Sequence, residues 1–234
     1  GDGTKTKELL KALDQGGFDF DYLPIDISHN ALEKLELTLK EEMPNVSVKT
    51  KQGDYFEVLA SLKDTHHPKV VLFLGSNIGN LLDYQAHDFI YQLGSSLSLN
   101  DKLFLGVDLI KSVDVVLPAY NDAAGITAAF NLNLLDRINK ELEGDFDKSK
   151  FVHKPEYIEE EGIAKSYLMS TEKQTVKVMG KSYAFQKGEK IHTEISRKYS
   201  DNIIAEILND TDFTLLQKLT DTQSLFADYI LKRG

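Results

Sequence analysis

The sequence contains no cysteine. This absence excludes disulfides, thiolate nucleophiles, and zinc or iron–sulfur sites built on cysteine. No apolar run approaches the ~20 residues that a membrane-spanning helix needs. A net charge of −10, with no basic block, argues against nucleic acid and anionic membranes as partners. These features fit a cytoplasmic protein with a small-molecule substrate, and they leave the oligomeric state open.

The first half of the chain alternates between short apolar runs and segments of helical periodicity. This rhythm predicts a doubly wound α/β sheet, in which helices cover both faces of parallel strands. We expect helices at 4–14, 29–43, 56–64 and 78–97, and strands at 21–28, 46–55, 69–76 and 101–110.

The rhythm changes after a long helix that we expect at 121–144. Residues 150–200 alternate between apolar and polar side chains, as antiparallel strands do, and two further strands are expected at 212–221 and 224–233. We therefore expect a Rossmann-like domain at 1–149 and 201–234, ending in an antiparallel hairpin. A β-rich substrate-binding insertion would occupy 150–200.

Ligands of open α/β sheets bind beyond the carboxyl ends of the strands. The glycine-rich stretch GDGTKT precedes the first helix, and Asp26 follows a strand 23 residues after Gly3, where an acid can bind ribose hydroxyls. Asp54 ends the next strand and can accept the amino hydrogens of adenine, while the adjacent Tyr55 stacks on the ring. The sequence thus predicts a nucleoside-shaped site. Two further strands end at GSNIGN (75–80) and at Asp108.

Two other functions remain open on these residues. A glycine-rich turn followed by Asp26 also suits a nicotinamide-dependent oxidoreductase, although the GDY stretch and the final hairpin disfavour it. The chain can alternatively be a catalytically inactive binding fragment.

Seven motifs carry a resemblance that spans nearly the whole chain. They are GDGTKT, PIDIS, GDY, LFLGSNIGN, GVDLIK, AYNDAAGITAAFNLNLLDRINKEL and TEIS. Their order resembles that of the histidine-specific, S-adenosyl-L-methionine-dependent methyltransferases, a family that includes the histidine Nα-methyltransferase of ergothioneine synthesis. The resemblance implies a class I methyltransferase fold with S-adenosyl-L-methionine as cofactor. It also implies methyl transfer to the α-amine of histidine or a histidine-like amino acid.

The resemblance assigns cofactor contacts to Gly3, Lys5, Asp26, Asp54, Tyr55 and Gly75. Lys5 would reach the methionine carboxylate, and Gly75 would lie in the loop that passes the cofactor. Asp26 would bind the ribose, as its place after a strand also suggests; a structural alternative is an acid that favours the start of the next helix.

The resemblance assigns the substrate contacts to four residues. Asn80 would hold and orient the α-amine, as the catalytic residue, and Tyr120 would bind the carboxylate. Glu194 and Ser196 would read the imidazole ring. Taken alone, these residues suit a helix cap, a core tyrosine and a solvated strand face. The implied reaction is direct displacement, with neither a metal nor a covalent nucleophile.

One stretch departs from the family pattern. The family segment R-I-E-M-H-L-x-S corresponds here to GIAKSYLMS, which places Ser166 at the methionine position and Lys165 at the preceding acid. A hydroxyl in place of a thioether changes the volume and polarity of the pocket. We therefore extend the expected acceptor from histidine to histidine-like amino acids.

Family members carry a strand and an E-L-G-x-G motif immediately before GDGTKT, and a helical segment before that. We accordingly expect this chain to be an N-terminally truncated fragment that lacks the first, central strand. The gap would be covered by a partner chain or closed by the neighbouring strands.

Overall fold

The computed structural model describes residues 3–63 and 67–234, and it divides into two compact units. The first unit comprises the chain up to residue 68 together with 92–99, and the second comprises 69–91 together with 100–234. Gly1 and Asp2, at the start of the predicted glycine loop, lie outside the described residues.

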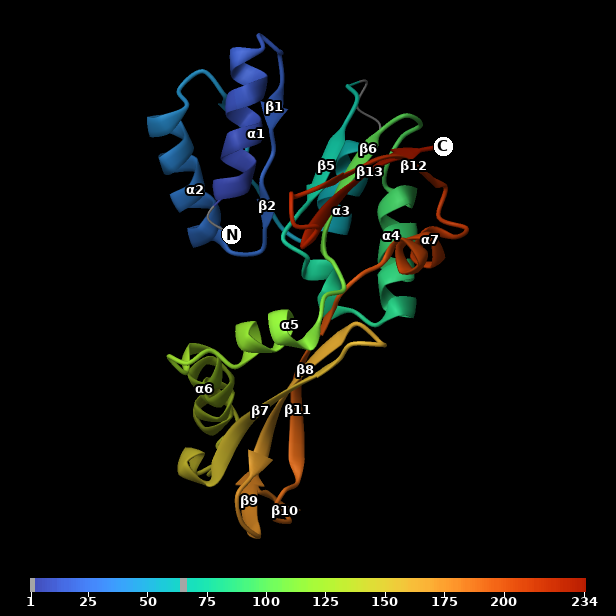
Figure 1. Ribbon diagram of the computed structural model, residues 1–234. Helices are drawn as coiled ribbons and strands as arrows, with labels where there is room; N and C mark the ends of the chain where they lie inside the picture. The colour runs from blue at the N-terminus through green and yellow to red at the C-terminus, as the bar shows by residue number, and fades with distance from the viewer. Residues whose placement is uncertain (1–2, 64–66) are drawn as a thin grey trace. The chain divides into compact units, whose positions relative to one another are not determined.

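The first unit packs helices on short parallel strands (Figure 1). The strands predicted at 21–28 and 46–55 are each divided into two short strands. Pro24, which has no N–H to donate, separates the two pieces of the first. Leu10, Leu39 and Met43 form the buried core of this unit. The elements are α1 (Thr4–Gln15), β1 (Asp21–Tyr22), β2 (Ile25–Asp26), α2 (His29–Glu42), β3 (Ser47–Val48), β4 (Lys51–Gln52) and α3 (Tyr55–Leu62), with β1 parallel to β3 and β2 parallel to β4.

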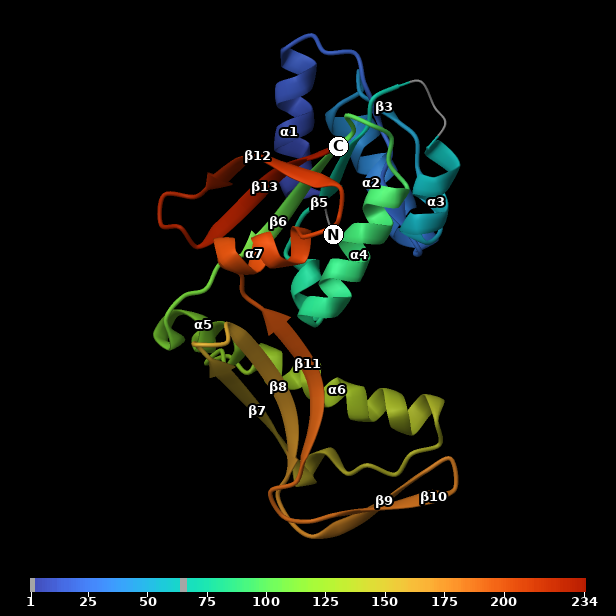
Figure 2. The same cartoon turned by 90° about the vertical axis from the view of Figure 1, so that its right-hand side faces the viewer.

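The second unit contains a four-stranded sheet in the order β12-β13-β6-β5. The pair β5–β6 is parallel, whereas β13 runs antiparallel to both β6 and β12, which confirms the predicted terminal hairpin. The helix α7 and the first turns of α4 lie along one face of this sheet (Figure 2). The elements are β5 (Val70–Phe73), η1 (Asn77–Asn80), α4 (Asp83–Ser95), β6 (Lys102–Asp108), α7 (Asp201–Leu208), β12 (Phe213–Thr220) and β13 (Phe226–Arg233). The last residues of α4, from 92 on, belong to the first unit.

The same unit carries an antiparallel lobe beyond the sheet (Figures 1 and 2). Its strands are ordered β11-β8-β7, and Leu135 of α6 packs with Phe151 and Leu168 to form its buried core. The strands all fall within the range predicted to be β-rich, while the domain boundaries at 150 and 200 stay a prediction. The elements are α5 (Val113–Tyr120), α6 (Ile126–Glu141), η2 (Lys148–Lys150), β7 (Phe151–Ile158), β8 (Ile163–Ser170), β9 (Gln174–Val178), β10 (Lys181–Phe185) and β11 (Lys190–Arg197).

The predicted helices need four corrections. The helix expected at 121–144 begins only at Ile126, because the Asp122 carboxylate accepts the N–H groups of Ile126 and Thr127 and so caps it there. A separate helix, α5, precedes this cap, and its internal Pro118 conceals it in the sequence. The helix α7 was not predicted, and the segment expected at 78–97 divides into η1 and α4.

The strands of the described residues do not join into one seven-stranded sheet, since the largest sheet has four strands. The truncation of the first strand stays a prediction. In the described part of the chain, no helix combines the length and the apolar character needed to cross a bilayer.

The cap at Asp122 predicts a specific dependence of stability on pH. Its hydrogen bonds to the backbone N–H groups of Thr127 and Ile126 lower its pKa from 3.8 to about 2. Because the pKa is depressed in the folded state, the cap stabilises the fold above the unfolded pKa and is lost as the pH falls toward 2. Asp122→Asn should therefore be less stable than the wild type near neutral pH, and the difference should shrink between about pH 4 and pH 2.

Urea unfolding across this pH range measures the effect. The matched control is Asp88→Asn, which removes an exposed carboxylate elsewhere. A constant difference between wild type and Asp122→Asn at all pH values would show that the carboxylate does not act as a charged cap.

Candidate active site

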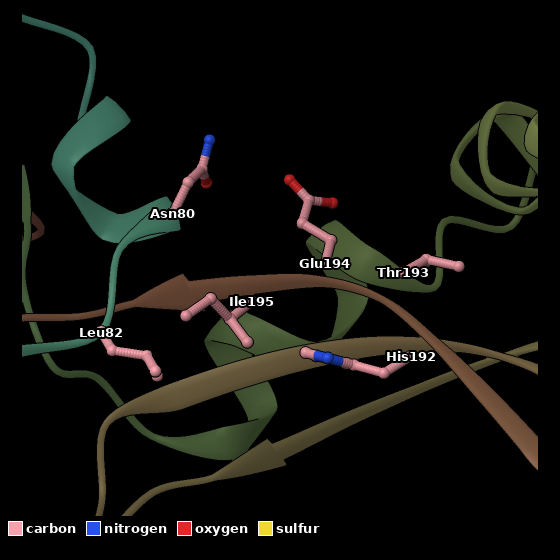
Figure 3. A pocket seen from close by; sticks show the side chains of 6 residues that line it. All are labelled: Asn80, Leu82, His192, Thr193, Glu194 and Ile195. Carbon is pink, nitrogen blue, oxygen red and sulfur yellow. The ribbon is translucent and has the colours of Figure 1, made fainter. Parts of the chain in front are cut away.

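A cavity of about 470 Å³ opens in the second unit between η1 and β11. Asn80 and Glu194 approach it from these two elements, and their polar ends point into the same space (Figure 3). The residues that line the cavity are Asn80, Leu82, His192, Thr193, Glu194 and Ile195.

Two polar groups, the Asn80 amide and the Glu194 carboxylate, stand at the centre of this cavity. Among the described residues, neither the Asn80 amide nor the Glu194 carboxylate makes a hydrogen bond or an ion pair. Asn80 is the last residue of η1, and its side chain caps none of the described helices. The alternative interpretation of Asn80 as a helix cap is therefore wrong. An amide and a carboxylate that face one cavity without partners are available to a ligand.

Asn80 is placed by the close packing of η1 on the end of β11. A Cβ on Gly79 would lie 2.7 Å from the carbonyl oxygen of Arg197, so only glycine permits this approach. The buried Tyr199 hydroxyl donates to the carbonyl of Ile78 at 3.1 Å. The Arg197 guanidinium donates to Asp83 at 2.8 Å, which ties the start of α4 to the same strand.

Glu194 is placed by a β-bulge at Thr193. His192 pairs with Tyr167 and Glu194 with Ser166, so Thr193 is an extra residue in β11. The Thr193 hydroxyl lies 2.7 Å from Oδ1 of Asn131 on α6 and 2.9 Å from the Ser166 carbonyl. The bulge therefore turns Glu194 to the face of the lobe sheet that carries Ser166.

Ser166, which the resemblance aligns with a methionine of the family, is buried beside the strand that carries Glu194. It is 1% exposed and stands directly opposite Glu194 in the antiparallel pair β8–β11. Opposite residues of such a pair project to the same face with their Cβ atoms about 5 Å apart. The substitution therefore changes the immediate surroundings of the Glu194 carboxylate.

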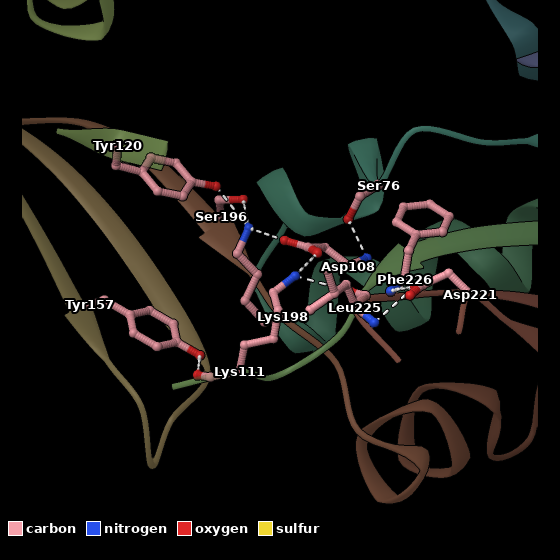
Figure 4. Close-up of polar contacts among 10 residues, drawn as sticks. All are labelled: Ser76, Asp108, Lys111, Tyr120, Tyr157, Ser196, Lys198, Asp221, Leu225 and Phe226. Carbon is pink, nitrogen blue, oxygen red and sulfur yellow. Dashed lines mark hydrogen bonds and ion pairs between the residues drawn. The ribbon is translucent and has the colours of Figure 1, made fainter. Parts of the chain in front are cut away.

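Tyr120 and Ser196 meet at one buried lysine (Figure 4). The Lys198 ammonium donates to Tyr120 Oη at 2.7 Å and to Ser196 Oγ at 2.9 Å, and it forms an ion pair with Asp108 Oδ2 at 2.9 Å. Burial lowers the pKa of Lys198, but its bonds to Tyr120 and Asp108 outweigh burial and raise that pKa overall. The other oxygen of Asp108 binds Lys111.

Lys198 was missed by the sequence analysis, and Asp108 was noted only as the end of a strand. The signal for Lys198 was present, because residues 194, 196 and 198 alternate onto one face of a strand. Nothing in that alternation shows that the lysine is buried or that it meets Asp108.

The predicted ribose and adenine acids lie beside each other in the first unit. Asp26 pairs with Gln52, and its carbonyl accepts the N–H of Gly53 at 3.1 Å, so Asp54 follows at the adjacent strand end. One oxygen of Asp26 accepts the N–H of Ser28 at 2.8 Å, and one oxygen of Asp54 caps α3 through Phe56 at 2.8 Å. The second oxygen of each carboxylate has no protein partner among the described residues.

The remaining residues predicted to bind the cofactor are at least partly accessible. Gly3 caps α1 with a φ of 74°, a left-handed conformation that favours glycine, and Lys5 is exposed in the first turn of that helix. Tyr55 begins α3 and is 42% exposed. In the second unit, Gly75 has a φ of 87°, and a Cβ there would meet no atom within 4 Å. Open glycine backbone of this kind fits the close approach of a cofactor.

Asp26 and Asp54 belong to the first unit and Asn80 belongs to the second. Their convergence on one ligand stays a prediction. Within the second unit, the structure does place Asn80 with Glu194, and Tyr120 with Ser196.

The packing at Gly79 leads to a prediction about stability. Gly79→Ala should push η1 away from β11 and lower the free energy of unfolding by about 1–3 kcal/mol, the usual cost of overpacking. Asn77→Ala, an exposed change in the same short helix, should cost less than about 0.5 kcal/mol. Chemical denaturation of both variants tests this, and equal stabilities would contradict the close approach of the two elements.

Comparisons with known proteins identify the family of this chain. The family described as "Histidine-specific methyltransferase, SAM-dependent" matches residues 1–233. The chain is 34% identical to the histidine N-alpha-methyltransferase of Mycobacterium tuberculosis (strain CDC 1551 / Oshkosh) over 231 residues, which cover 97% of this chain and 72% of the relative. It is 34% identical over 212 residues to the protein of the same name from Mycolicibacterium smegmatis (strain ATCC 700084 / mc(2)155), which covers 88% and 66% respectively.

A solved structure supports the fold. The pyocyanin biosynthetic protein PhzM superimposes with a TM-score of 0.50 at 9% identity, covering 100% of this chain and 48% of that protein. The chain thus spans about two thirds of the length of the Mycolicibacterium smegmatis relative and less than half of this structural neighbour. The α/β sheet, the terminal hairpin and the family match lead to one conclusion: the chain belongs to the family of histidine-specific, S-adenosyl-L-methionine-dependent methyltransferases.

Proposed function

We propose that this chain transfers methyl groups from S-adenosyl-L-methionine to the α-amine of histidine or a histidine-like amino acid. The observation that carries the proposal is that Asn80 and Glu194 face one cavity and have no partner in the described part of the chain. One can hold an amine and the other can accept a ring N–H. Because the chain covers only 66% of one relative and 72% of another, its own activity requires a direct test.

The cofactor of this family is S-adenosyl-L-methionine. When bound, it supplies a methyl group that the sulfonium charge has already activated. We assign its contacts to the residues of the glycine loop, the two acid-bearing strand ends and the loop after β5. These residues are Gly3, Lys5, Asp26, Asp54, Tyr55 and Gly75.

The residues of the second unit would align the acceptor. The side-chain oxygen of Asn80 accepts an N–H of the neutral α-amine and so directs the nitrogen lone pair. Tyr120 binds the carboxylate, and Glu194 accepts the ring N–H while Ser196 binds the other ring nitrogen. The protein then contributes mainly orientation and exclusion of water, which can supply several kcal/mol of barrier reduction.

Glu194 supports histidine as the first choice of acceptor. A site with a buried polar group rejects ligands that leave this group unpaired, so an amino acid without a ring N–H should bind poorly. Ser166, opposite Glu194, leaves more room than the family methionine and adds a hydroxyl. We therefore keep ring-modified histidines as acceptors within the proposal.

The two alternatives remain outcomes of the test. Family membership speaks against the nicotinamide-dependent oxidoreductase, and an inactive binding fragment would bind the cofactor without turnover. A cytoplasmic location, and the absence of nucleic-acid and membrane partners, stay predictions from the sequence.

Incubation of the chain with S-adenosyl-L-methionine and histidine, followed by mass spectrometry, tests the proposal. We expect histidine to gain one or more methyl groups. Glu194→Gln should lower kcat/KM for histidine by about tenfold or more, because the bond lost is one to a charged group. Its affinity for S-adenosylhomocysteine should be unchanged.

The matched control is Glu160→Gln, an exposed residue in the turn between β7 and β8 that lies outside the cavity. It should leave kcat/KM unchanged. Binding of S-adenosylhomocysteine without methylation of histidine or its ring analogues would identify an inactive fragment. Binding of a nicotinamide dinucleotide instead would favour the oxidoreductase.

A further inference from the structure

We propose that Lys198 is a positioning residue that fixes the direction of two hydrogen bonds, so that Tyr120 and Ser196 both act as donors to the ligand. This inference rests on the proposed function and deepens it. It assigns the ligand a free carboxylate and a neutral ring that has one N–H and one bare nitrogen.

The first step is that Lys198 has no hydrogen left for a ligand. A lysine ammonium carries three N–H donors and no acceptor. Its three partners are Asp108 Oδ2 at 2.9 Å, Tyr120 Oη at 2.7 Å and Ser196 Oγ at 2.9 Å. The side chain is only 4% exposed. Lys198 therefore acts on the ligand through its neighbours.

The second step concerns the two hydroxyls. Because the ammonium can only donate, both oxygens must accept from it, and the single hydrogen of each hydroxyl is left over. Among the described residues, Tyr120 and Ser196 have no acceptor for that hydrogen, and both side chains are half-buried. Each hydroxyl is thus ready to donate to a ligand, and the charge of Lys198 strengthens it as a donor.

The third step is that this arrangement is held from several sides. The Asp108 carboxylate also binds Lys111, so two ammonium groups surround one carboxylate and leave a positive balance beside Tyr120. The Nε2–H of His153 donates to the Tyr120 carbonyl at 2.9 Å. The backbone N–H of Lys198 donates to the Gly162 carbonyl at 2.7 Å. Figure 4 shows the network of side chains around the Lys198 ammonium.

The ligand chemistry follows from these directions. Tyr120 donates to an acceptor, which a carboxylate provides, and the positive balance favours its charge. Ser196 and Glu194 are two residues apart on one face of β11, so they offer a donor and an acceptor side by side. A neutral azole matches both groups. A protonated azole would set an N–H against the Ser196 hydrogen.

Calorimetry with three probes tests the inference, in the presence of S-adenosylhomocysteine. Histidine is compared with histidinol, which lacks the carboxylate, and with 2-thienylalanine, which lacks ring nitrogens. Tyr120→Phe should remove the preference for histidine over histidinol and retain the preference over thienylalanine. Ser196→Ala should weaken the second preference and retain the first.

Lys198→Met supplies the decisive comparison. It should reduce both preferences by about tenfold, the effect of weakening a charge-assisted bond. In the Tyr120→Phe background it should have no further effect on the preference over histidinol, since the two residues act on the same bond. Its affinity for S-adenosylhomocysteine should stay unchanged. A merely structural role would weaken the binding of every ligand equally and additively.

The outcomes separate this inference from the proposed function. Failure of the wild type to bind histidine would overturn both. Binding by the wild type with unchanged preferences in Lys198→Met would overturn the role of Lys198 alone. If Lys198→Met does not fold, Tyr120→Phe and Ser196→Ala still test the inference. Each should change a different one of the two preferences, and failure to do so would overturn the inference.

Discussion

The ion pair between Asp108 and Lys198 is the interaction on which the rest of the site depends. Asp108 ends β6, in the sheet, and Lys198 follows β11, in the lobe. The backbone joins the same two places, since the Tyr199 N–H donates to the Asp108 carbonyl at 2.8 Å and the Ile110 N–H donates to the Tyr199 carbonyl at 3.0 Å. Removal of the Asp108 carboxylate would leave the buried Lys198 ammonium without its ion-pair partner, which is costly in proteins.

A second contact places the residues that face the cavity. The packing of Gly79 against Arg197 brings Asn80 toward β11, while the bulge at Thr193 turns Glu194 toward the same space. One strand therefore carries Glu194 and Ser196, the residues that we propose to bind the ring. Its last residue, Arg197, also fixes the position of Asn80, which we propose to bind the amine.

Much of the fold could be predicted from periodicity, because the apolar residues of β6 and of the final hairpin follow their expected patterns. The helix α5 was missed because it contains Pro118, and the start of α6 was misplaced because Asp122 was not recognised as its cap. Both errors arise from local chemistry that competes with a helical pattern.

The site, like the fold, could be predicted from the sequence only in part. The family motifs named Asn80, Tyr120, Glu194 and Ser196, and the structure brings them into two adjoining groups. The sequence could not show that Lys198 is buried, because this depends on the distant Asp108. Nor could it show the bulge at Thr193, which depends on Asn131 of another element.

A crystal structure of this chain with histidine and S-adenosylhomocysteine tests the central claim most directly. The account predicts the carboxylate of histidine at hydrogen-bond distance from Tyr120 Oη, and its ring between Glu194 and Ser196. Histidine bound with its carboxylate away from Tyr120, or with its ring outside this pair, would contradict it.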